Sequence, residues 1–427
     1  MTLMLASACQ KGPALSKHSE VSTFETPSLG PIGSDRLGVL LDQVPVYAGS
    51  SKNAPRLGFL HAGTELPRSS KNAVTPDCEK GWYQLAPRGY VCADEGISLN
   101  LDHPTLKAMA LRPELEKPLP YVYGKLVQSA PVYEKTHIGK ALEPGVKVSG
   151  RLSRGSGVAI VGSWTAPDES KEPIFLGLRM NGQFVATRDL APAPESQFQG
   201  VRLGEGGEDL PLAFVVRRGV SAFRWTAAGP QKARDLEYHE RLSLTGRYRS
   251  SAGHQYWALP DDLWVRHQDV TMIHKRGELP EFAKDDQKWI DVSVITGIMV
   301  LYEGTRPVYA TLASVGRDRL GDPKTTASTE RGTFRVVSKQ ITRRAAPETT
   351  GPALEDAPWA LELESGQWLT ASPLHDRFGI ENTDGDIEVS PRDGAFVWNW
   401  ATPNLPQGWH GVQIQPGDPV TLVNIRK

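Results

Sequence analysis

The sequence predicts a mainly β protein built from several small domains. Its 427 residues are too many for one compact core and indicate two to four domains. Apolar residues make up 39% of the chain and are accompanied by 41 glycines and 33 prolines. This combination favours many short strands and turns over long helices. No apolar run approaches the length needed to cross a bilayer.

The charge balance and the absence of nucleotide motifs limit the classes of function. The chain has 48 basic and 49 acidic residues, a net charge of −1, so no overall basic field attracts nucleic acid. It contains no Walker loop and no dinucleotide-binding glycine pattern. We therefore expect neither a nucleic-acid partner nor a cofactor.

A short β pattern recurs three times in the first two thirds of the chain. Each copy has an opening strand, then a hairpin-like turn before a valine, and an acidic residue four positions after that valine. The opening strands begin at Val44, Ala130 and Val220, and the acidic residues are Glu95, Asp189 and Asp269. These segments resemble bacterial SH3-like barrels, and we assign modules to residues 36–102, 113–195 and 211–275. Their aromatic residues are expected to form barrel cores.

The pattern changes from about residue 286 to the end. Residues 288–304 predict two strands around Thr296-Gly297, and residues 308–316 predict a third. Further on stand Trp368-Leu-Thr-Ala-Ser-Pro-Leu-His375-Asp-Arg-Phe-Gly379 and Thr383-Asp-Gly-Asp-Ile-Glu-Val-Ser-Pro391. Their order resembles the catalytic segment of the L,D-transpeptidase (YkuD-type) family, in which an upstream His precedes Ser/Thr-His-Gly-Cys-x-Asn. The resemblance covers residues 286–427 and implies a β-sandwich domain there.

This sequence retains several residues that surround the family's reactive residues, but it lacks the reactive residues themselves. The matching positions that are retained are His375, Asp376, Phe378, Gly379, Gly385, Ser390 and Pro391. At the positions that differ, Thr370 replaces the upstream His, Asp384 the second His, Asp386 the nucleophilic Cys and Glu388 the Asn. A carboxylate is a weak nucleophile toward an amide and opposes the negative charge that must develop in acyl transfer. We therefore expect no transpeptidase activity and no catalytic residue, and we interpret the retained positions as the frame of a former substrate groove.

The alternating acids at 384, 386 and 388 allow a second interpretation. An extended backbone would place all three carboxylates on one face, where they could hold a hard cation such as Ca²⁺. An exposed acidic strand without an ion is the alternative, and it is the one we expect. We predict no metal site.

The cysteines point to export. Cys78 and Cys92 flank a glycine-containing connection that could bring two strands together, which predicts a disulfide; two separate half-buried thiols are the alternative. Cys9 follows Leu5-Ala-Ser-Ala, which resembles a lipobox, and residues 1–35 then correspond to a signal remnant and a flexible tether. The alternative is an incidental cysteine.

Taken together, these features predict a cell-envelope or periplasmic protein, anchored to the membrane only through a lipid, that binds peptidoglycan or envelope proteins. Two alternatives stay open. One is an active transpeptidase or acyltransferase with a non-standard nucleophile, and the other is a passive envelope scaffold.

Overall fold

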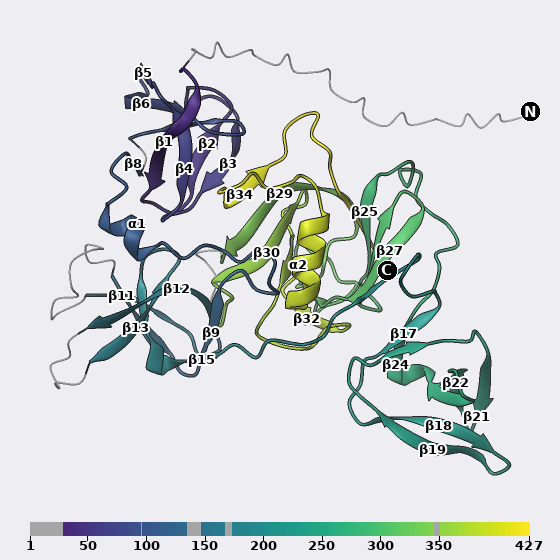
Figure 1. The fold of residues 1–427 in the computed structure, drawn as a ribbon. Helices are drawn as coiled ribbons and strands as arrows, with labels where there is room; N and C mark the ends of the chain where they lie inside the picture. Colours follow the sequence, from purple (N-terminus) through teal and green to yellow (C-terminus); the bar gives the residue numbers. More distant parts are fainter. Residues whose placement is uncertain (1–28, 95, 135–146, 167–172, 346–350) are drawn as a thin grey trace, which may run out of the picture.

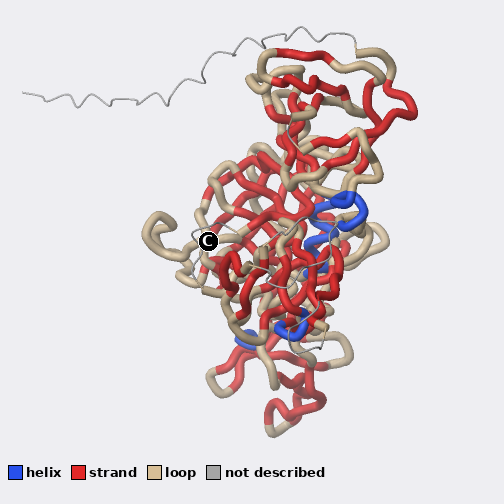
Figure 2. The backbone as a smooth tube through the Cα atoms, turned by 90° about the vertical axis from the view of Figure 1, so that its left-hand side faces the viewer, coloured by secondary structure: helices blue, strands red, loops and turns tan. Residues whose placement is uncertain are grey.

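The computed structural model describes residues 29–94, 96–134, 147–166, 173–345 and 351–427. Strands predominate in this part of the chain, with two short α-helices, α1 (Pro104–Ala108) and α2 (Pro391–Trp400) (Figures 1 and 2). The predicted mainly β fold class is therefore confirmed. No helix of the described ranges combines the length and the apolar composition of a membrane span.

The first module holds two facing sets of strands. Their bounds are β1 (Ile32–Val39), β2 (Val44–Tyr47), β3 (Arg56–Leu60), β4 (Glu65–Ser69), β5 (Ala73–Thr75), β6 (Cys78–Gln84), β7 (Tyr90–Cys92) and β8 (Ile97–Ser98). β1 pairs with β4 and β8, and β3, β2, β7, β6 and β5 are paired in that order. Cys78 of β6 and Cys92 of β7 form a disulfide with their Cα atoms 5.8 Å apart, so this prediction is confirmed.

The second and third modules have strands where the repeat predicted them. The second contains β9 (Val122–Leu126), β10 (Ala130–Tyr133), β11 (Val148–Leu152), β12 (Gly157–Ala166), β13 (Ile174–Arg179), β14 (Phe184–Ala186) and β15 (Leu190–Pro192). The third contains β17 (Leu212–Val215), β18 (Val220–Thr226), β19 (Gly229–Leu236), β20 (Arg241–Ser243), β21 (Tyr248–Ser251), β22 (His254–Ala258), β23 (Leu263–Arg266) and β24 (Val270–Ile273). Asp189 and Asp269 each end a 3-10 turn, η1 (Thr187–Asp189) and η2 (His267–Asp269), just before the last strand. Glu95 lies outside the described residues, and the SH3-like class of the three modules stays a prediction.

The C-terminal domain occupies the centre of the molecule (Figure 1). Its elements, with one short strand from the preceding connection, are β16 (Val201–Arg202), β25 (Lys288–Ser293), β26 (Ile298–Glu303), β27 (Arg306–Leu312), β28 (Val315–Gly316), β29 (Gly332–Arg344), β30 (Asp356–Leu363), β31 (Trp368–Ala371), β32 (Glu381–Thr383), β33 (Ile387–Val389), α2, β34 (Gly411–Gln413) and β35 (Leu422–Arg426). The hairpin expected around Thr296-Gly297 is formed by β25 and β26. The last strand, β35, returns to pair parallel with β25.

A single path of paired strands joins the C-terminal domain to the first module. β34 pairs with β29 on one side and with β3 of the first module on the other. The two backbones come very close, because a Cβ on Gly411 would lie 2.2 Å from Phe59 Cε1 and one on Gly58 would lie 2.1 Å from the Gly411 oxygen. Glycine at both positions therefore permits this junction.

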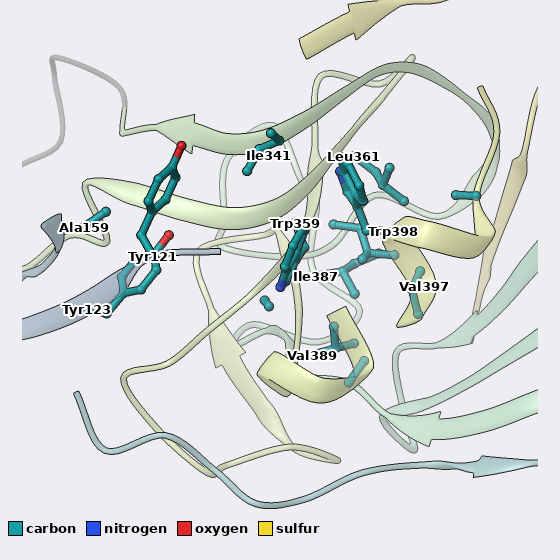
Figure 3. Packing of buried hydrophobic residues seen from close by; sticks show 14 of the residues in the cluster. Tyr121, Tyr123, Ala159, Ile341, Trp359, Leu361, Ile387, Val389, Val397 and Trp398 are labelled. Carbon is teal, nitrogen blue, oxygen red and sulfur yellow. The ribbon is translucent and has the colours of Figure 1, made fainter. Parts of the chain in front are cut away.

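The main core lies under α2 and continues into the second module. Trp359 and Trp398 lie side by side in it, with ring centroids 5.1 Å apart, and Ile387 and Val389 of β33 pack into the same cluster (Figure 3). Ala159 of the second module belongs to this cluster too. Strand β33, which carries part of the motif, is thus fixed from behind by a continuous core.

Candidate functional site

The motif strands β31 and β33 run parallel and are direct neighbours. In their register Thr370 is opposite Glu388, and Ala371 is opposite Val389. Thr370 is only 3% exposed. The structure therefore brings together two positions that are eighteen residues apart in sequence.

The turn before β33 is held by its own side chains. The Thr383 hydroxyl donates to the Asp386 carbonyl at 2.5 Å and accepts from the Gly385 N–H at 3.3 Å. Gln367 Nε2 donates to the Gly385 carbonyl at 2.7 Å. Gly385 has φ +120°, a conformation that favours glycine. Gly385, which matches the glycine of the motif, therefore allows the backbone conformation of this turn.

Asp386, at the nucleophile position, has both carboxylate oxygens occupied. Arg343 Nη1 donates to Oδ2 at 2.5 Å, and the Trp368 N–H donates to Oδ1 at 2.9 Å. The Arg343 guanidinium also lies over the Trp368 ring, 4.8 Å from its centroid. The carboxylate is thus paired with a cation and held in one orientation by a donor on each oxygen.

The expectation of one acidic face is wrong. Asp384 pairs with Arg317 and is 80% exposed, whereas Asp386 pairs with Arg343. Glu388 turns to His375 instead. Because the chain bends at Gly385, the backbone is not one extended strand and the three carboxylates have three separate partners.

His375 contacts the site through Glu388. Its Nδ1 accepts from the Arg377 N–H at 3.0 Å, so the ring proton is on Nε2, which lies 2.8 Å from Glu388 Oε2 and donates to it. The imidazole is therefore oriented toward the position of the family's Asn. It is not a partner of Asp386 among the described contacts.

The rest of the retained frame is structural. Phe378 is fully buried, and its carbonyl accepts from His239 Nε2 of the third module at 3.2 Å. Burial lowers the pKa of His239 to about 4, so the ring is a neutral donor near pH 7. Asp376 pairs with Arg218, also of the third module, at 2.5 Å. The segment from His375 to Gly379 is thus clamped by a module that precedes it by more than 100 residues.

Ser390 and Pro391 begin helix α2. The Ser390 hydroxyl accepts from the Asp393 N–H at 3.1 Å, and proline occupies the first turn, where its missing N–H costs nothing. Asp393 is buried and accepts from Tyr309, Thr311 and the Gly200 N–H. Burial nevertheless raises the pKa of Asp393. These residues anchor the helix and take no part in a reactive cluster.

Sequence reasoning missed the partners of the motif. Arg343 and Arg317 lie within residues 286–427 but outside the two motif segments, whereas Arg218 and His239 lie in the third module. An acid at the nucleophile position implies a nearby cation, and that was the only available signal. It does not say which of 48 basic residues supplies the charge.

The predicted cysteine and metal features lie away from this site. Within the part of the chain that the structure describes, Cys78, Cys92 and Asp94 are close enough to form a three-ligand group. Their sulfurs are joined in the disulfide, and Asp94 accepts from the Glu79 and Lys80 N–H groups at 2.8 Å each. Neither sulfur is therefore a thiolate ligand. Cys9 lies outside the described residues.

Comparisons with known proteins give a distant likeness. No protein-family model matches the chain, and no curated protein does either. Among solved structures it is similar to an L,D-transpeptidase from Xylanimonas cellulosilytica, with 19% identity, a TM-score of 0.24, and coverage of 35% of this chain and 65% of that one. An L,D-transpeptidase of Enterococcus faecium shows 16% identity, a TM-score of 0.24, and coverage of 33% and 50%. One from Mycobacterium smegmatis shows 18% identity, a TM-score of 0.25, and coverage of 42% and 77%. The chain thus spans less than two thirds of the first two proteins, and likeness at this level says nothing about activity.

Proposed function

We propose that this is a peptidoglycan-binding protein of the cell envelope whose transpeptidase-type domain does not transfer acyl groups. It works by holding the polymer and forms no covalent intermediate with it. The transpeptidase resemblance of residues 286–427 motivates the polymer as the ligand.

The observation that carries the proposal is the pairing of Asp386. Acyl transfer by the family's route needs an activated thiolate and free N–H donors for the oxyanion. At position 386 a carboxylate pairs with Arg343 instead, and the Trp368 N–H donates to the same group. Both oxygens of the group at this position are engaged in internal hydrogen bonds.

Location in the envelope is part of the proposal. The Cys78–Cys92 disulfide suits an oxidising compartment. The lipobox-like segment ending at Cys9 would provide the anchor. Both features agree with a protein that meets the cell wall from the membrane side.

Incubation with purified sacculi tests the proposal. We expect the protein to co-sediment with sacculi and the muropeptide profile, read by mass spectrometry, to stay unchanged. An active L,D-transpeptidase in parallel controls for competent sacculi. New cross-links would refute the inactive assignment, and failure to co-sediment would refute binding and favour a scaffold.

A further inference from the structure

The third module carries a hydrophobic cluster outside its own core. That core lies between the sheets β20-β17-β24 and β19-β18-β23-β22-β21 and draws on both. Trp264 stands directly before Val265 in β23, and because Val265 belongs to the core, Trp264 points to the opposite face of the sheet. The outer face of this sheet is therefore aromatic, where one face of an antiparallel sheet is usually polar. The members of the outer cluster are Phe223, Trp225, Tyr256, Ala258 and Trp264.

Arg249 of the edge strand β21 covers two of these rings. Its guanidinium carbon lies 5.2 Å from the centroid of Trp225 and 4.8 Å from that of Trp264. Cations are attracted to the faces of aromatic rings, so these contacts fix the orientation of the guanidinium. The side chain is exposed, and its N–H groups have no hydrogen-bond or ion-pair partner within the described chain. Arg249 thus presents all of its donors to solvent.

Arg266 of β23 covers the other two rings. Its guanidinium carbon lies 4.9 Å from the centroid of Phe223 and 5.9 Å from that of Tyr256. Its Nε donates to the Tyr256 hydroxyl at 3.3 Å, and its two Nη groups have no partner among the described residues. Arg249, Arg266 and the four rings form what we call the arginine–aromatic face.

The two arginines are separate binding points. In the register of the sheet, Tyr256 pairs with Arg249 on one side and with Arg266 on the other. Neighbouring strands lie about 4.8 Å apart, so the Cα atoms of the two arginines lie about 10 Å apart. Each guanidinium is held over its own pair of rings and offers a planar fork, which binds a phosphate through two parallel N–H bonds. The face therefore fits phosphate groups that repeat along one ligand.

The charge around the face favours a polyanion. Residues 211–275 include ten basic and six acidic residues, a net charge of +4, although the whole chain has −1. Lys232 of β19 is offset by Asp235 at 2.6 Å, whereas no carboxylate of the described chain lies within ion-pair distance of Arg249 or Arg266. A concentration of one sign of charge raises the local concentration of ligands of the opposite sign.

The position of the face in the molecule favours a polymer over a membrane surface. The described chain begins at Leu29 in the first module, at the end of the molecule opposite to the third module (Figures 1 and 2). Within the third module, β18 and β19 lie farther from the C-terminal domain than β17 and β24 do (Figure 1). A lipid at Cys9 would tether the end that holds the first module, which directs the arginine–aromatic face away from the bilayer.

We propose that the arginine–aromatic face binds a phosphodiester-linked polyol polymer of the cell envelope. Each arginine takes one phosphate, and the half-buried rings of Phe223 and Trp225 contact the carbon chain between the phosphates. The oxidising compartment indicated by the Cys78–Cys92 disulfide favours an envelope polymer over nucleic acid. This inference rests on the proposed function only for the location in the envelope, and it adds a second ligand.

Titration of the full chain with a synthetic poly(glycerol phosphate) tests the face. We expect saturable binding that weakens as salt is added, since exposed charges are screened. The monomer, sn-glycerol 3-phosphate, should bind at least about tenfold more weakly, because it cannot link both arginines. Equal affinity for monomer and polymer would refute the two-point contact, and no binding of the polymer to the wild type would overturn the inference.

Arg249→Gln/Arg266→Gln should weaken polymer binding by about tenfold or more, because both forks are lost. The matched control is Arg154→Gln/Arg188→Gln, which removes the same net charge from two exposed arginines of the second module and should keep the wild-type affinity. Equal losses in the two variants would mean that net charge alone attracts the polymer, and the assignment to this face would then be wrong.

Arg249→Lys/Arg266→Lys guards against a folding defect in the glutamine variant. It keeps both cations beside the rings and removes only the planar forks. We expect a several-fold weaker Kd together with a native circular dichroism spectrum. Wild-type affinity in the lysine variant would refute recognition by the guanidinium forks.

Vesicles of phosphatidylglycerol carry the same phosphodiester at a bilayer surface and represent the competing ligand. We expect weaker binding to these vesicles than to the polymer; tighter binding, lost in the glutamine variant, would assign the face to the membrane and refute the polymer. Co-sedimentation of the wild type with sacculi stripped of phosphate polymers tests the proposed function alone. Each proposal can therefore fail while the other stands.

Discussion

Position 386 holds a carboxylate that accepts from a cation, Arg343, and from the backbone N–H of Trp368 at once. Arg343 both donates to Asp386 and lies over Trp368, so removing either charge disturbs the same small cluster. Side chains of the pair are 26% and 34% exposed, which limits their mutual stabilisation to roughly 1 kcal/mol. The pair matters more for chemistry than for stability, because it fixes the electrostatic potential where the family has a thiol.

A thiol introduced at this position should therefore be unusually acidic. In Asp386→Cys the sulfur would lie beside Arg343, which favours the thiolate and lowers the thiol pKa below its usual value of about 8.5. The rate of iodoacetamide alkylation as a function of pH gives that pKa, with the wild type as the background from Cys9. In Asp386→Cys/Arg343→Gln the midpoint should rise by about one pH unit; identical midpoints would show that Arg343 does not act on the site.

An acidic thiol should still not be acylated by a carbapenem. Thr370 and Asp384 stand where the resemblance places the two imidazoles, so we expect no donor for proton transfer to the leaving nitrogen. We expect no adduct in the mass spectrum of Asp386→Cys, and an adduct only when Thr370→His, Asp384→His and Glu388→Asn are added. An adduct on the single variant would mean that the proposed loss of catalysis depends on position 386 alone, and an adduct on the wild type would refute that loss.

At the scale of single elements, α2 shows how the chain fixes the strand that carries the motif. Its N-terminus is capped by Ser390, and at its C-terminal end Lys339 and Lys288 donate to the Ala401 and Trp400 carbonyls, each at 2.9 Å. Cations at this end are favourable for the helix dipole. Burial, aided by the nearby Lys288 charge, lowers the pKa of Lys339 to about 7.

This buried lysine predicts a pH dependence of stability. Between pH 7 and 10.5 the unfolded chain keeps the Lys339 proton that the folded chain has lost, so the free energy of unfolding rises with pH, by up to about 1.4 kcal/mol per pH unit. Below pH 7 both states are protonated and the contribution is constant. Urea unfolding at several pH values should show a wild-type advantage over Lys339→Met that grows from pH 7 to 9.

Lys232→Met, at an exposed position, is the control for this experiment. Its free energy of unfolding should change with pH in parallel with that of the wild type. Parallel curves for wild type and Lys339→Met would instead contradict the assignment of this titration to Lys339.

The disulfide gives a second prediction at this scale. It joins β6 to β7 across a separation of 14 residues, and closing a loop of that length stabilises a fold by about 3 kcal/mol in the chain-entropy account. Cys78→Ala/Cys92→Ala should therefore lower the urea midpoint of the unfolding transition that includes the first module, followed by tryptophan fluorescence because Trp82 packs beside the bridge. An unchanged midpoint, with the wild type verified as oxidised by mass, would refute this.

How well the sequence predicted a feature depended on how far apart its interacting residues lie in the sequence. The β25–β26 hairpin, the opening strands at Val44 and Ala130 and the Cys78–Cys92 bridge depend on patterns within about twenty residues, and these were predicted correctly. The partners of the motif are separated from it by 43 residues for Arg343 and 158 for Arg218, and no local pattern encodes such contacts. The three-acid face failed for a local reason, since the bend at Gly385 replaced the extended strand that was assumed.

At the scale of the whole molecule, the modules are not independent domains, because they contact the C-terminal domain. β3 and β34 pair across the boundary between the first module and the C-terminal domain, and the third module clamps the segment from His375 to Gly379. Trp409 belongs to the core of the first module although it comes from the last domain. The first module and the C-terminal domain are therefore expected to unfold together.

Gly411→Ala tests this coupling. Its Cβ would lie 2.2 Å from Phe59 Cε1, so the Phe59 ring or β34 itself must shift, with a cost of about 1–3 kcal/mol for overpacking. We expect a lower Tm and, by limited proteolysis, earlier cleavage near the junction. Gly150→Ala is the matched control, because a Cβ there meets nothing within 4 Å. Equal effects of the two substitutions would contradict a tight junction.

The place of Trp409 in the first module also dictates when that module can fold. Ribosomes complete residues 36–102 long before they reach position 409, so the earliest part of the chain lacks one wall of its core while more than 300 further residues are added. We therefore expect the first module to lack this part of its core until the polypeptide is almost finished. For the export proposed above, such late completion of the core would favour transport through a secretion channel that accepts only unfolded chains.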